Sequence, residues 1–154
     1  MTKLSSDSII YISEVMMPHK ANVAGNIHGG EIIKMMDSAA YASARRYARS
    51  NAVTARIDEV EFHLPIMIGD LVTCTAQVVY VGTSSMEVVV TVDVEDLEDE
   101  GKKRALSAYF TMVALDKKGK PAHIAALELK TPEEEKAFAE GRKRYESHKQ
   151  RTTR

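Results

Sequence analysis

Residues 25–37 read GNIHGGEIIKMMD, and this stretch joins a turn-forming loop to a helix. Asparagine, histidine and two adjacent glycines precede an apolar run whose repeat is that of a helix and not of a strand. At about 100° per residue, the helix predicted from Gly30 to about Arg49 has a very wide apolar arc. An arc of this width predicts a helix covered by a sheet, or by a sheet and a partner subunit. Asp37 lies inside that arc, where an unpaired carboxylate is costly.

β-Rich segments lie on both sides of this helix. The first is residues 8–16, and it leads into a long loop that ends at the helix. Four more segments with alternating apolar residues follow, at 54–64, 71–81, 85–95 and 104–115. The order of one strand, one helix and four strands predicts an α+β fold, in which a sheet covers the long helix.

Two details of these strands are also predicted. Residues 54–64 change the phase of their alternation, which indicates a bulge near Asp58 and Glu59. Within 71–81, the alternation puts Tyr80 on the same face as Cys74 and Val78.

The end of the chain has a different character. Thr131 and Pro132, followed by glutamates, form a helix start with a capping hydroxyl and a first-turn proline. Charged residues dominate the rest of the chain, so we expect a helix exposed to solvent with a frayed basic end. We therefore divide the chain into a single domain at 1–130 and a charged helix and tail at 131–154.

The composition limits the class of protein. Hydrophobic residues make up 44% and charged residues 28% of the 154 residues, as in soluble globular proteins. No apolar run approaches the ~20 residues of a membrane-spanning helix and no secretory signal is evident, so we expect a cytoplasmic protein without a membrane partner. A single cysteine, Cys74, and the lack of a Cys/His cluster argue against a structural metal. The net charge of −1 argues against general nucleic-acid binding and leaves small anionic ligands open.

The mouth of the helix supplies candidate donors. A helix N-terminus presents unpaired N–H groups, and Gly29 and Gly30 let a substrate approach the backbone closely, as an oxyanion hole requires. The alternative is an ordinary tight turn into the helix. His28 can hydrogen-bond near such a site or serve the loop structurally. Asn26 can orient a water or polarise a carbonyl, and it is equally an ordinary turn residue.

Asp37 is the candidate general base, because desolvation raises the pKa of a carboxyl group toward neutral pH. The alternative is a structural aspartate bound to a backbone N–H or to Arg45 or Arg56. Asp37 is about seven residues into the helix, hence roughly 10 Å along the axis from its N-terminus. One chain is therefore poorly arranged to bring Asp37 and its own Asn26 to one water, and a site shared across a two-fold dimer is indicated.

Three segments resemble one known family. ANVAGNIHGGEIIKMMD (21–37), VTARIDEVEFHLPIMIGD (53–70) and VYVGTSSMEVVVTV (79–92) resemble the hotdog-fold acyl-CoA thioesterases, in particular the long-chain (brain-type) acyl-CoA hydrolases and their bacterial relatives. The resemblance covers about residues 8–145 and implies the hotdog fold, in which an antiparallel sheet wraps a long central helix. The same resemblance implies hydrolysis of fatty acyl-CoA to a free fatty acid and CoA. It also implies homodimers, assembled as trimers of dimers into hexamers, and no cofactor beyond the CoA of the substrate.

The resemblance also assigns residues to roles. It implies that Asn26 and Asp37, one from each subunit, form the catalytic pair, and that Asp37 acts as a base or attacks directly to form an anhydride. His28, Gly29 and Gly30 are expected to contact the substrate or its oxyanion. The predicted CoA-binding residues are Gly82, Ser84 and Ser85 in the VGTSSM turn. Arg56 is added as a basic residue that can meet the phosphates, and the alternative is a solvated surface charge.

Two other functions within the same fold remain as alternatives. A dehydratase or hydratase of acyl thioesters needs a histidine at the reacting carbon, and His28 is the candidate near the helix mouth. A non-catalytic acyl-CoA-binding protein needs no such group. We expect the thioesterase.

Overall fold

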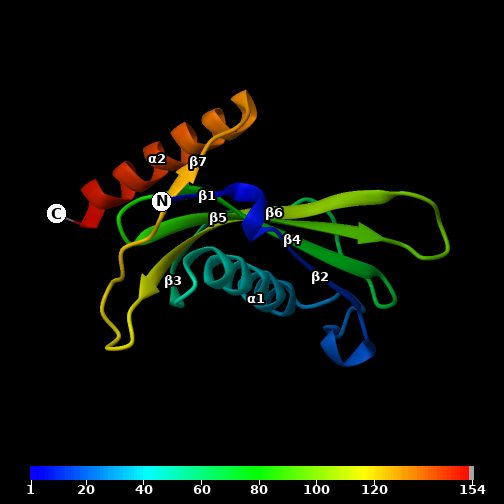
Figure 1. The fold of residues 1–154 in the computed structure, drawn as a ribbon. Coiled ribbons are helices and arrows are strands. Elements are labelled where there is room, and N and C mark those ends of the chain that lie inside the picture. The colour runs from blue at the N-terminus through cyan, green and yellow to red at the C-terminus, as the bar shows by residue number, and fades with distance from the viewer. Residues whose placement is uncertain (153–154) are drawn as a thin grey trace.

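A long helix lies against one face of a five-stranded antiparallel sheet in the computed structural model, which describes residues 1–152 and the side chains of residues 1–150 (Figure 1). The helix is α1, Gly29–Ala48. The strands run in the order β2-β4-β5-β6-β3. Their bounds are Ile10–Val15 for β2, Asn51–Phe62 for β3, Leu71–Val81 for β4, Ser85–Glu95 for β5 and Lys102–Leu115 for β6. The predicted order of one strand, one helix and four strands is confirmed, and with it the hotdog arrangement.

Smaller elements complete the chain. Strands β1 (Thr2–Leu4) and β7 (Ala126–Glu128) pair in parallel, and two 3-10 turns lie at Ser5–Ser8 and Pro18–Lys20. The second long helix is α2, Pro132–Thr152. Because three-residue strands have too few positions for an alternating pattern, the sequence did not predict β1 or β7.

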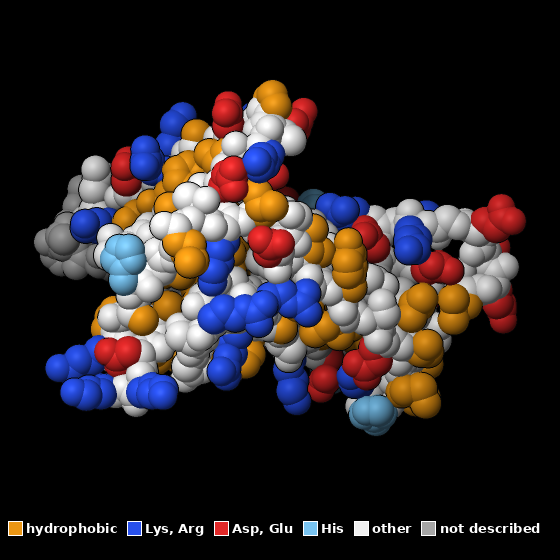
Figure 2. Space-filling view, viewed as in Figure 1, with side chains coloured by type: hydrophobic (Ala, Val, Ile, Leu, Met, Phe, Trp, Pro, Cys, Tyr) orange, Lys and Arg blue, Asp and Glu red, His pale blue; other side chains and the backbone are white. Residues whose placement is uncertain are grey.

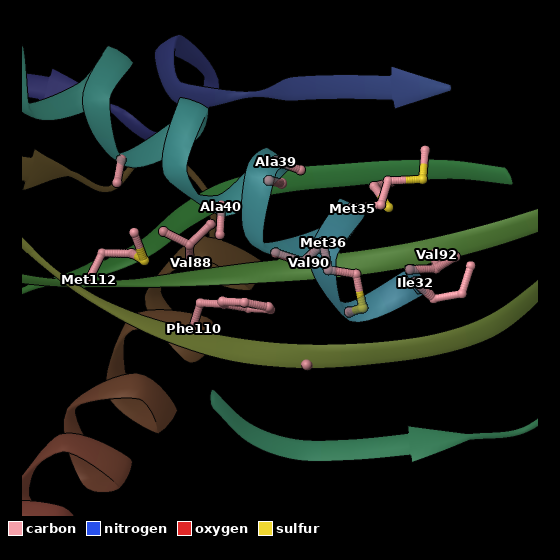
Figure 3. Packing of buried hydrophobic residues seen from close by; sticks show 14 of the residues in the cluster. Ile32, Met35, Met36, Ala39, Ala40, Val88, Val90, Val92, Phe110 and Met112 are labelled. Carbon is pink, nitrogen blue, oxygen red and sulfur yellow. The ribbon is translucent and has the colours of Figure 1, made fainter. Parts of the chain in front are cut away.

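The core lies between α1 and the sheet. Side chains from the helix, among them Ile32 and Met36, pack against Val90 of the central strand β5 and Phe110 of its neighbour β6 (Figure 3). Each large aliphatic or aromatic side chain buried in this way contributes about 1.5–3 kcal/mol. Ala39 and Ala40 are fully buried and let the helix backbone approach the strands closely. The sheet thus covers most of the wide apolar arc of α1. This packing holds the helix in position against the strands.

β3 is an edge strand and is irregular. It pairs with β6 alone, so its second edge is free within one chain. The pairing register shifts between Thr54 and Arg56 and again between Asp58 and Glu61, and Glu59 has a left-handed backbone with φ of 56°. The predicted bulge near Asp58 is confirmed, and the one between Thr54 and Arg56 was not predicted. Free edges of this kind are usually covered in the assembled protein.

The orientation predicted for Tyr80 is wrong. A bulge between Val78 and Tyr80 shifts the register of β4 against β5, so that Tyr80 pairs with Glu87. Cys74 and Val78 point to α1, whereas the Tyr80 ring lies on the other face, against the rings of Phe138 and Tyr145 of α2. An extra residue in a strand reverses every later side chain, and alternation alone does not reveal it.

The C-terminal helix, predicted to be a solvated surface element, is exposed along most of its length, but one side packs on the sheet, which the sequence did not predict. α2 lies across the sheet face opposite α1, and contacts four strands in succession (Figure 1). Phe138 packs on Tyr80 of β4, and Arg144 forms a two-bond ion pair with the buried Glu87 of β5, at 2.6 and 2.9 Å. The Arg144 guanidinium also lies 3.7 Å from the ring centroid of Tyr109 in β6, and the pair with Glu87 raises the pKa of Arg144.

α2 contacts β3, the fourth of these strands, through His148, whose Nε2 lies 2.7 Å from a carboxylate oxygen of Asp58. Besides Arg144, the inward residues of α2 include Phe138, Gly141, Tyr145 and His148, spaced by three or four positions among many charges. This sparse stripe was the signal in the sequence. The last residues of the predicted basic end, 153–154, lie outside the described residues.

Gly141→Ala tests how closely α2 is packed. An alanine Cβ at this position would lie 2.7 Å from Tyr80 Cβ and 3.1 Å from a Glu87 carboxylate oxygen. We expect a loss of about 1–3 kcal/mol in the free energy of unfolding, because overpacking outweighs the gain of about 1 kcal/mol in helix propensity. Chemical denaturation measures this, with the exposed neighbour Glu140→Ala as control. A variant as stable as the wild type would contradict the close contact.

The surface charge is unevenly distributed, although the net charge is small. Figure 2, a side view with α2 above the sheet and α1 below it, shows Lys and Arg side chains gathered in the middle and at the lower left. Acidic side chains lie at the opposite end, in the turn between β5 and β6, where Asp96, Glu98, Asp99 and Glu100 are all exposed. The formal net charge of −1 therefore conceals a basic and an acidic region.

Candidate active site

The loop before α1 is held by Asn22. Its backbone N–H donates to the Asn26 carbonyl at 2.7 Å, and its side-chain Oδ1 accepts from the N–H groups of Ala24 and Asn26 at 3.0 and 3.2 Å. Gly25 takes the left-handed backbone of the turn, with φ of 90°. The loop is thus rigid at its base, and it brings both asparagines next to the helix mouth.

The N-terminus of α1 has free donors. His28 is the N-cap residue, its ring is exposed, and no side chain caps the helix. Among the described residues, the N–H groups of Gly29 and Gly30 have no hydrogen-bond acceptor. An added Cβ at Gly30 would meet nothing within 4 Å, whereas one at Gly29 would lie 3.3 Å from the Phe62 ring. Two backbone donors with the partial positive charge of a helix start therefore face accessible space.

A cavity of about 390 Å³ lies at this helix mouth. Asn22, Asn26 and Gly29 form its polar side, and apolar side chains form much of the rest. The further lining residues are Ile27, Ile32, Phe62, His63, Leu64, Pro65 and Ile66. A polar mouth beside an apolar wall is suited to a carbonyl group attached to a hydrocarbon chain.

Asp37 lies elsewhere on the same helix. It is half-buried, and its Oδ1 accepts a hydrogen bond of 2.6 Å from the Thr54 hydroxyl of β3. Neither arginine considered as a partner of Asp37 contacts it. Arg45 donates to the Tyr41 hydroxyl, and Arg56 is on the other side of the sheet. Asp37 follows Gly29 by eight residues, hence by about 12 Å along the axis, and it does not line the cavity.

Thr54 is the site residue that the sequence analysis missed. Its hydroxyl contacts both Asp37 and the sulfur of Met112, at 2.6 and 3.4 Å, so it faces α1. A polar residue in the inward phase of a strand was the available signal, and the unpredicted bulge after Thr54 obscured that phase. The Thr54 bond fixes one carboxylate oxygen of Asp37. The other, Oδ2, has no hydrogen-bond partner among the described residues.

The predicted CoA-binding residues do not meet at the cavity. Gly82, Ser84 and Ser85 form the β4–β5 turn, in which the Gly82 N–H donates to the Ser85 carbonyl at 2.8 Å. The Ser84 carbonyl accepts from Ala114 of β6 at 2.8 Å. Arg56 lines a different cavity, beside α2. Of the predicted site residues, Asn26 and Gly29 line the cavity at the start of α1. His28 and Gly30 lie beside them at the same helix start.

The single thiol of the sequence, that of Cys74, lies in the core. Burial raises the pKa of the Cys74 thiol to about 12, so this thiol is not a nucleophile at neutral pH. Among the described residues, no group of three or more His, Cys, Asp or Glu side chains is placed to hold a metal ion. The same part of the chain contains no helix long and apolar enough to cross a membrane.

Comparison with known proteins identifies the family. A family model described as the thioesterase superfamily matches residues 24–100. The chain belongs to the hotdog-fold acyl-CoA thioesterases. The chain is 36% identical over 143 residues to the cytosolic acyl coenzyme A thioester hydrolase of Rattus norvegicus. The match covers 92% of this chain, and the chain spans only 37% of the rat protein.

Two solved structures are similar to this chain over nearly its whole length. One is the acyl-CoA hydrolase of Staphylococcus aureus, solved with butyryl coenzyme A and coenzyme A, which is 33% identical with a TM-score of 0.90. The match covers 99% of this chain and 93% of the S. aureus chain. The other is an apo-hexameric acyl-CoA thioesterase, which is 30% identical with a TM-score of 0.92. That match covers 98% of this chain and 97% of the hexameric protein's chain.

The S. aureus protein was also solved as three alanine variants, of an asparagine, an aspartate and a threonine. In that protein the asparagine precedes the aspartate by fifteen positions, and the threonine follows it by seventeen.

Proposed function

We propose that this protein hydrolyses fatty acyl-CoA to a free fatty acid and CoA at a site shared by two subunits. The observation that carries the proposal is the separation of two half-sites on one rigid helix. The asparagine and glycine donors lie at the mouth of α1, and the Asp37–Thr54 pair lies about 12 Å further along it. A two-fold partner beside the free edge of β3 would bring its own helix mouth to this pair and complete two sites.

The chemistry assigned to each group follows from its contacts. Oδ2 of Asp37 takes a proton from water, while the Thr54 hydroxyl holds Oδ1 and thereby fixes the plane of the carboxylate. The water attacks the thioester carbonyl carbon. The N–H groups of Gly29 and Gly30 from the partner subunit donate to the developing oxyanion. The CoA thiolate then leaves without a strong acid, because a thiolate is a good leaving group at neutral pH.

An asparagine of the partner subunit positions the water or the thioester. Asn26 is the one predicted from the sequence, and it stays a prediction. The spacing in the S. aureus protein favours Asn22, which precedes Asp37 by fifteen positions, whereas Asn26 precedes it by eleven. The same comparison supports Thr54, seventeen positions after Asp37. The side-chain amide of Asn22 donates to no group among the described residues, so it is available to the substrate.

The assembly and surroundings of the protein are proposed from its relatives. The hexameric thioesterase supports a hexamer, for which we propose a trimer of dimers, and the cytosolic rat hydrolase supports a cytoplasmic location. CoA enters as part of the substrate, and the mechanism uses no other cofactor. The turn of Gly82, Ser84 and Ser85 remains the predicted contact for the CoA moiety. Residues 1–130 remain the predicted catalytic domain.

Thiol release from acyl-CoA substrates of short, medium and long chains tests the function. We expect the wild type to release one thiol per fatty acid, with the preferred chain length set by the apolar wall of the cavity. A thiol reagent and quantification of the free acid measure this together. A folded oligomer that binds acyl-CoA and releases no thiol would instead indicate an acyl-CoA-binding protein. Hydration of an enoyl-CoA would indicate the dehydratase, with His28 as the group to substitute.

A further inference from the structure

The Phe62 ring stands at the entrance of the cavity at the helix mouth. Phe62 is the last residue of β3, and 51% of it is exposed although it lines the cavity together with Asn22 and Gly29. The tip of its ring, the Cζ atom, lies 3.3 Å from the position that a Cβ at Gly29 would take, and Cε1 lies 3.7 Å from it. The ring therefore stands directly beside the residue whose N–H is a proposed oxyanion donor.

The backbone on both sides of this entrance is held by hydrogen bonds. Phe62 itself is paired with Leu106 of β6, and the next N–H, that of His63, donates to the Ala105 carbonyl at 2.8 Å. Across the cavity, the Ile27 N–H donates to the Ile66 carbonyl at 2.8 Å, which joins the loop before α1 to the segment after β3. The size of the side chain at position 62 therefore sets the width of the entrance.

A thioester bound at the helix mouth brings its acyl chain past this ring. With a hydrogen bond of about 2.9 Å from the Gly29 N–H to the carbonyl oxygen, carbon C2 of the acyl group lies about 5 Å from the Gly29 nitrogen. The apolar wall lies further in, where Ile32 and Ile66 are buried. A straight chain passes the ring as a single row of methylene groups, whereas a branch at C2 needs volume that the ring occupies.

We propose that Phe62 is a specificity-determining residue that favours straight-chain acyl groups over acyl groups branched at C2. This inference rests on the proposed function, because it takes the Gly29 N–H as a ligand of the thioester oxygen. A branch at the far end of the chain lies in the cavity beyond the ring, so Phe62 does not select against it.

The place of Phe62 in the strand agrees with a site shared by two subunits. Thr54 lies near the start of β3, and Phe62 is its last residue. Two β3 strands paired antiparallel across a two-fold axis bring the end of one strand beside the start of the other. Phe62 and Gly29 of one subunit then lie close to the partner subunit's Thr54. The alternative role of a half-exposed aromatic ring at this edge is subunit contact alone.

Kinetics with hexanoyl-CoA, 2-methylhexanoyl-CoA and 5-methylhexanoyl-CoA test the proposal. We expect Phe62→Ala to raise kcat/KM for the 2-methyl substrate, relative to hexanoyl-CoA, about tenfold, which is the lower end of the effect of one methylene in an apolar pocket. The ratio for the 5-methyl substrate should not change. Phe62→Leu keeps part of the volume, so it should raise the 2-methyl ratio less, and it carries the same test if the alanine variant is unfolded.

Ile57→Ala is the control for these measurements. It also removes an exposed apolar side chain from β3, and it does not line the cavity, so we expect it to change neither ratio. An unchanged 2-methyl ratio in Phe62→Ala, or an equal rise for both branched substrates, would overturn the proposal. Weaker self-association by sedimentation with unchanged ratios would assign the ring to subunit contact instead.

Binding of thioether analogues separates this proposal from the proposed function. If the wild type hydrolyses none of the three thioesters, the proposed function fails. Calorimetry with the thioether analogues of hexanoyl-CoA and 2-methylhexanoyl-CoA then decides the role of Phe62. Tighter binding of the straight-chain analogue to the wild type, with this preference lost in Phe62→Ala, supports the proposal. Equal affinities in the wild type, or no binding of either analogue, would contradict it.

Discussion

Asp37→Asn is expected to lower kcat for acyl-CoA hydrolysis by about 10²- to 10⁴-fold, the contribution of a positioned general base. The asparagine Oδ1 can still accept the 2.6 Å hydrogen bond from Thr54, so the fold and the contact between α1 and β3 should persist. KM should change little, because the carboxylate acts on water rather than on the bound chain. Initial rates of thiol release across a range of substrate concentrations measure both constants.

The control for this variant is Ser38→Ala, which changes an exposed neighbour on the same helix. Wild-type activity in Asp37→Asn with unchanged oligomeric state would remove Asp37 from the mechanism. Hydrolysis in ¹⁸O-labelled water then separates the two routes open to Asp37. Attack by water puts the label only in the fatty acid, whereas an anhydride intermediate also labels the Asp37 carboxylate when water attacks its carbonyl.

Asn22→Asp is expected to lower kcat by about 10²- to 10³-fold, the effect of losing one positioned donor. An aspartate keeps the acceptor for Ala24 and Asn26, so the loop is retained while the side-chain N–H is lost. Asn26→Asp makes the same chemical change four positions later and is the matched comparison. A smaller effect there is expected from the spacing argument. The opposite ranking would restore Asn26 as the second catalytic residue.

Mixing two inactive variants tests the shared site directly. After subunit exchange between Asp37→Asn and Asn22→Asp, about half of the dimers contain one subunit of each kind. One of their two sites then receives an intact Asp37 from one subunit and an intact Asn22 from the other. Activity should return to about a quarter of the wild-type value. No recovery after proven exchange would mean that each chain forms its own site.

Much of the fold could be predicted because burial imposes a period on the sequence. The α1 pattern spans twenty residues, so the helix was predicted within one residue at each end. The five strands of the main sheet were also predicted, because each alternates over six or more residues. Tyr80 was misplaced, since the bulge before it depends on pairing with β5.

The contacts of α2 show a different limit. The side of α2 that faces the sheet includes a glycine and a histidine, and many charged residues surround them. From the sequence, such a helix has no clear apolar stripe. What buries Arg144 and Glu87 is their pairing across elements fifty-seven positions apart in the chain. A charge is predicted to be exposed unless its partner is known, and the partner is known only from the structure.

The sequence alone determined the central helix, the antiparallel sheet and the local chemistry of the helix mouth. These features depend on neighbours a few positions apart, through helical or strand periodicity and through the free N–H groups at a helix start. Only the tertiary structure decided that Thr54 holds Asp37, that Asp37 lies away from the asparagine cavity, and that Arg56 faces a second cavity under α2. These contacts join residues from different elements, so their geometry is set by register, bulges and packing that no single segment specifies.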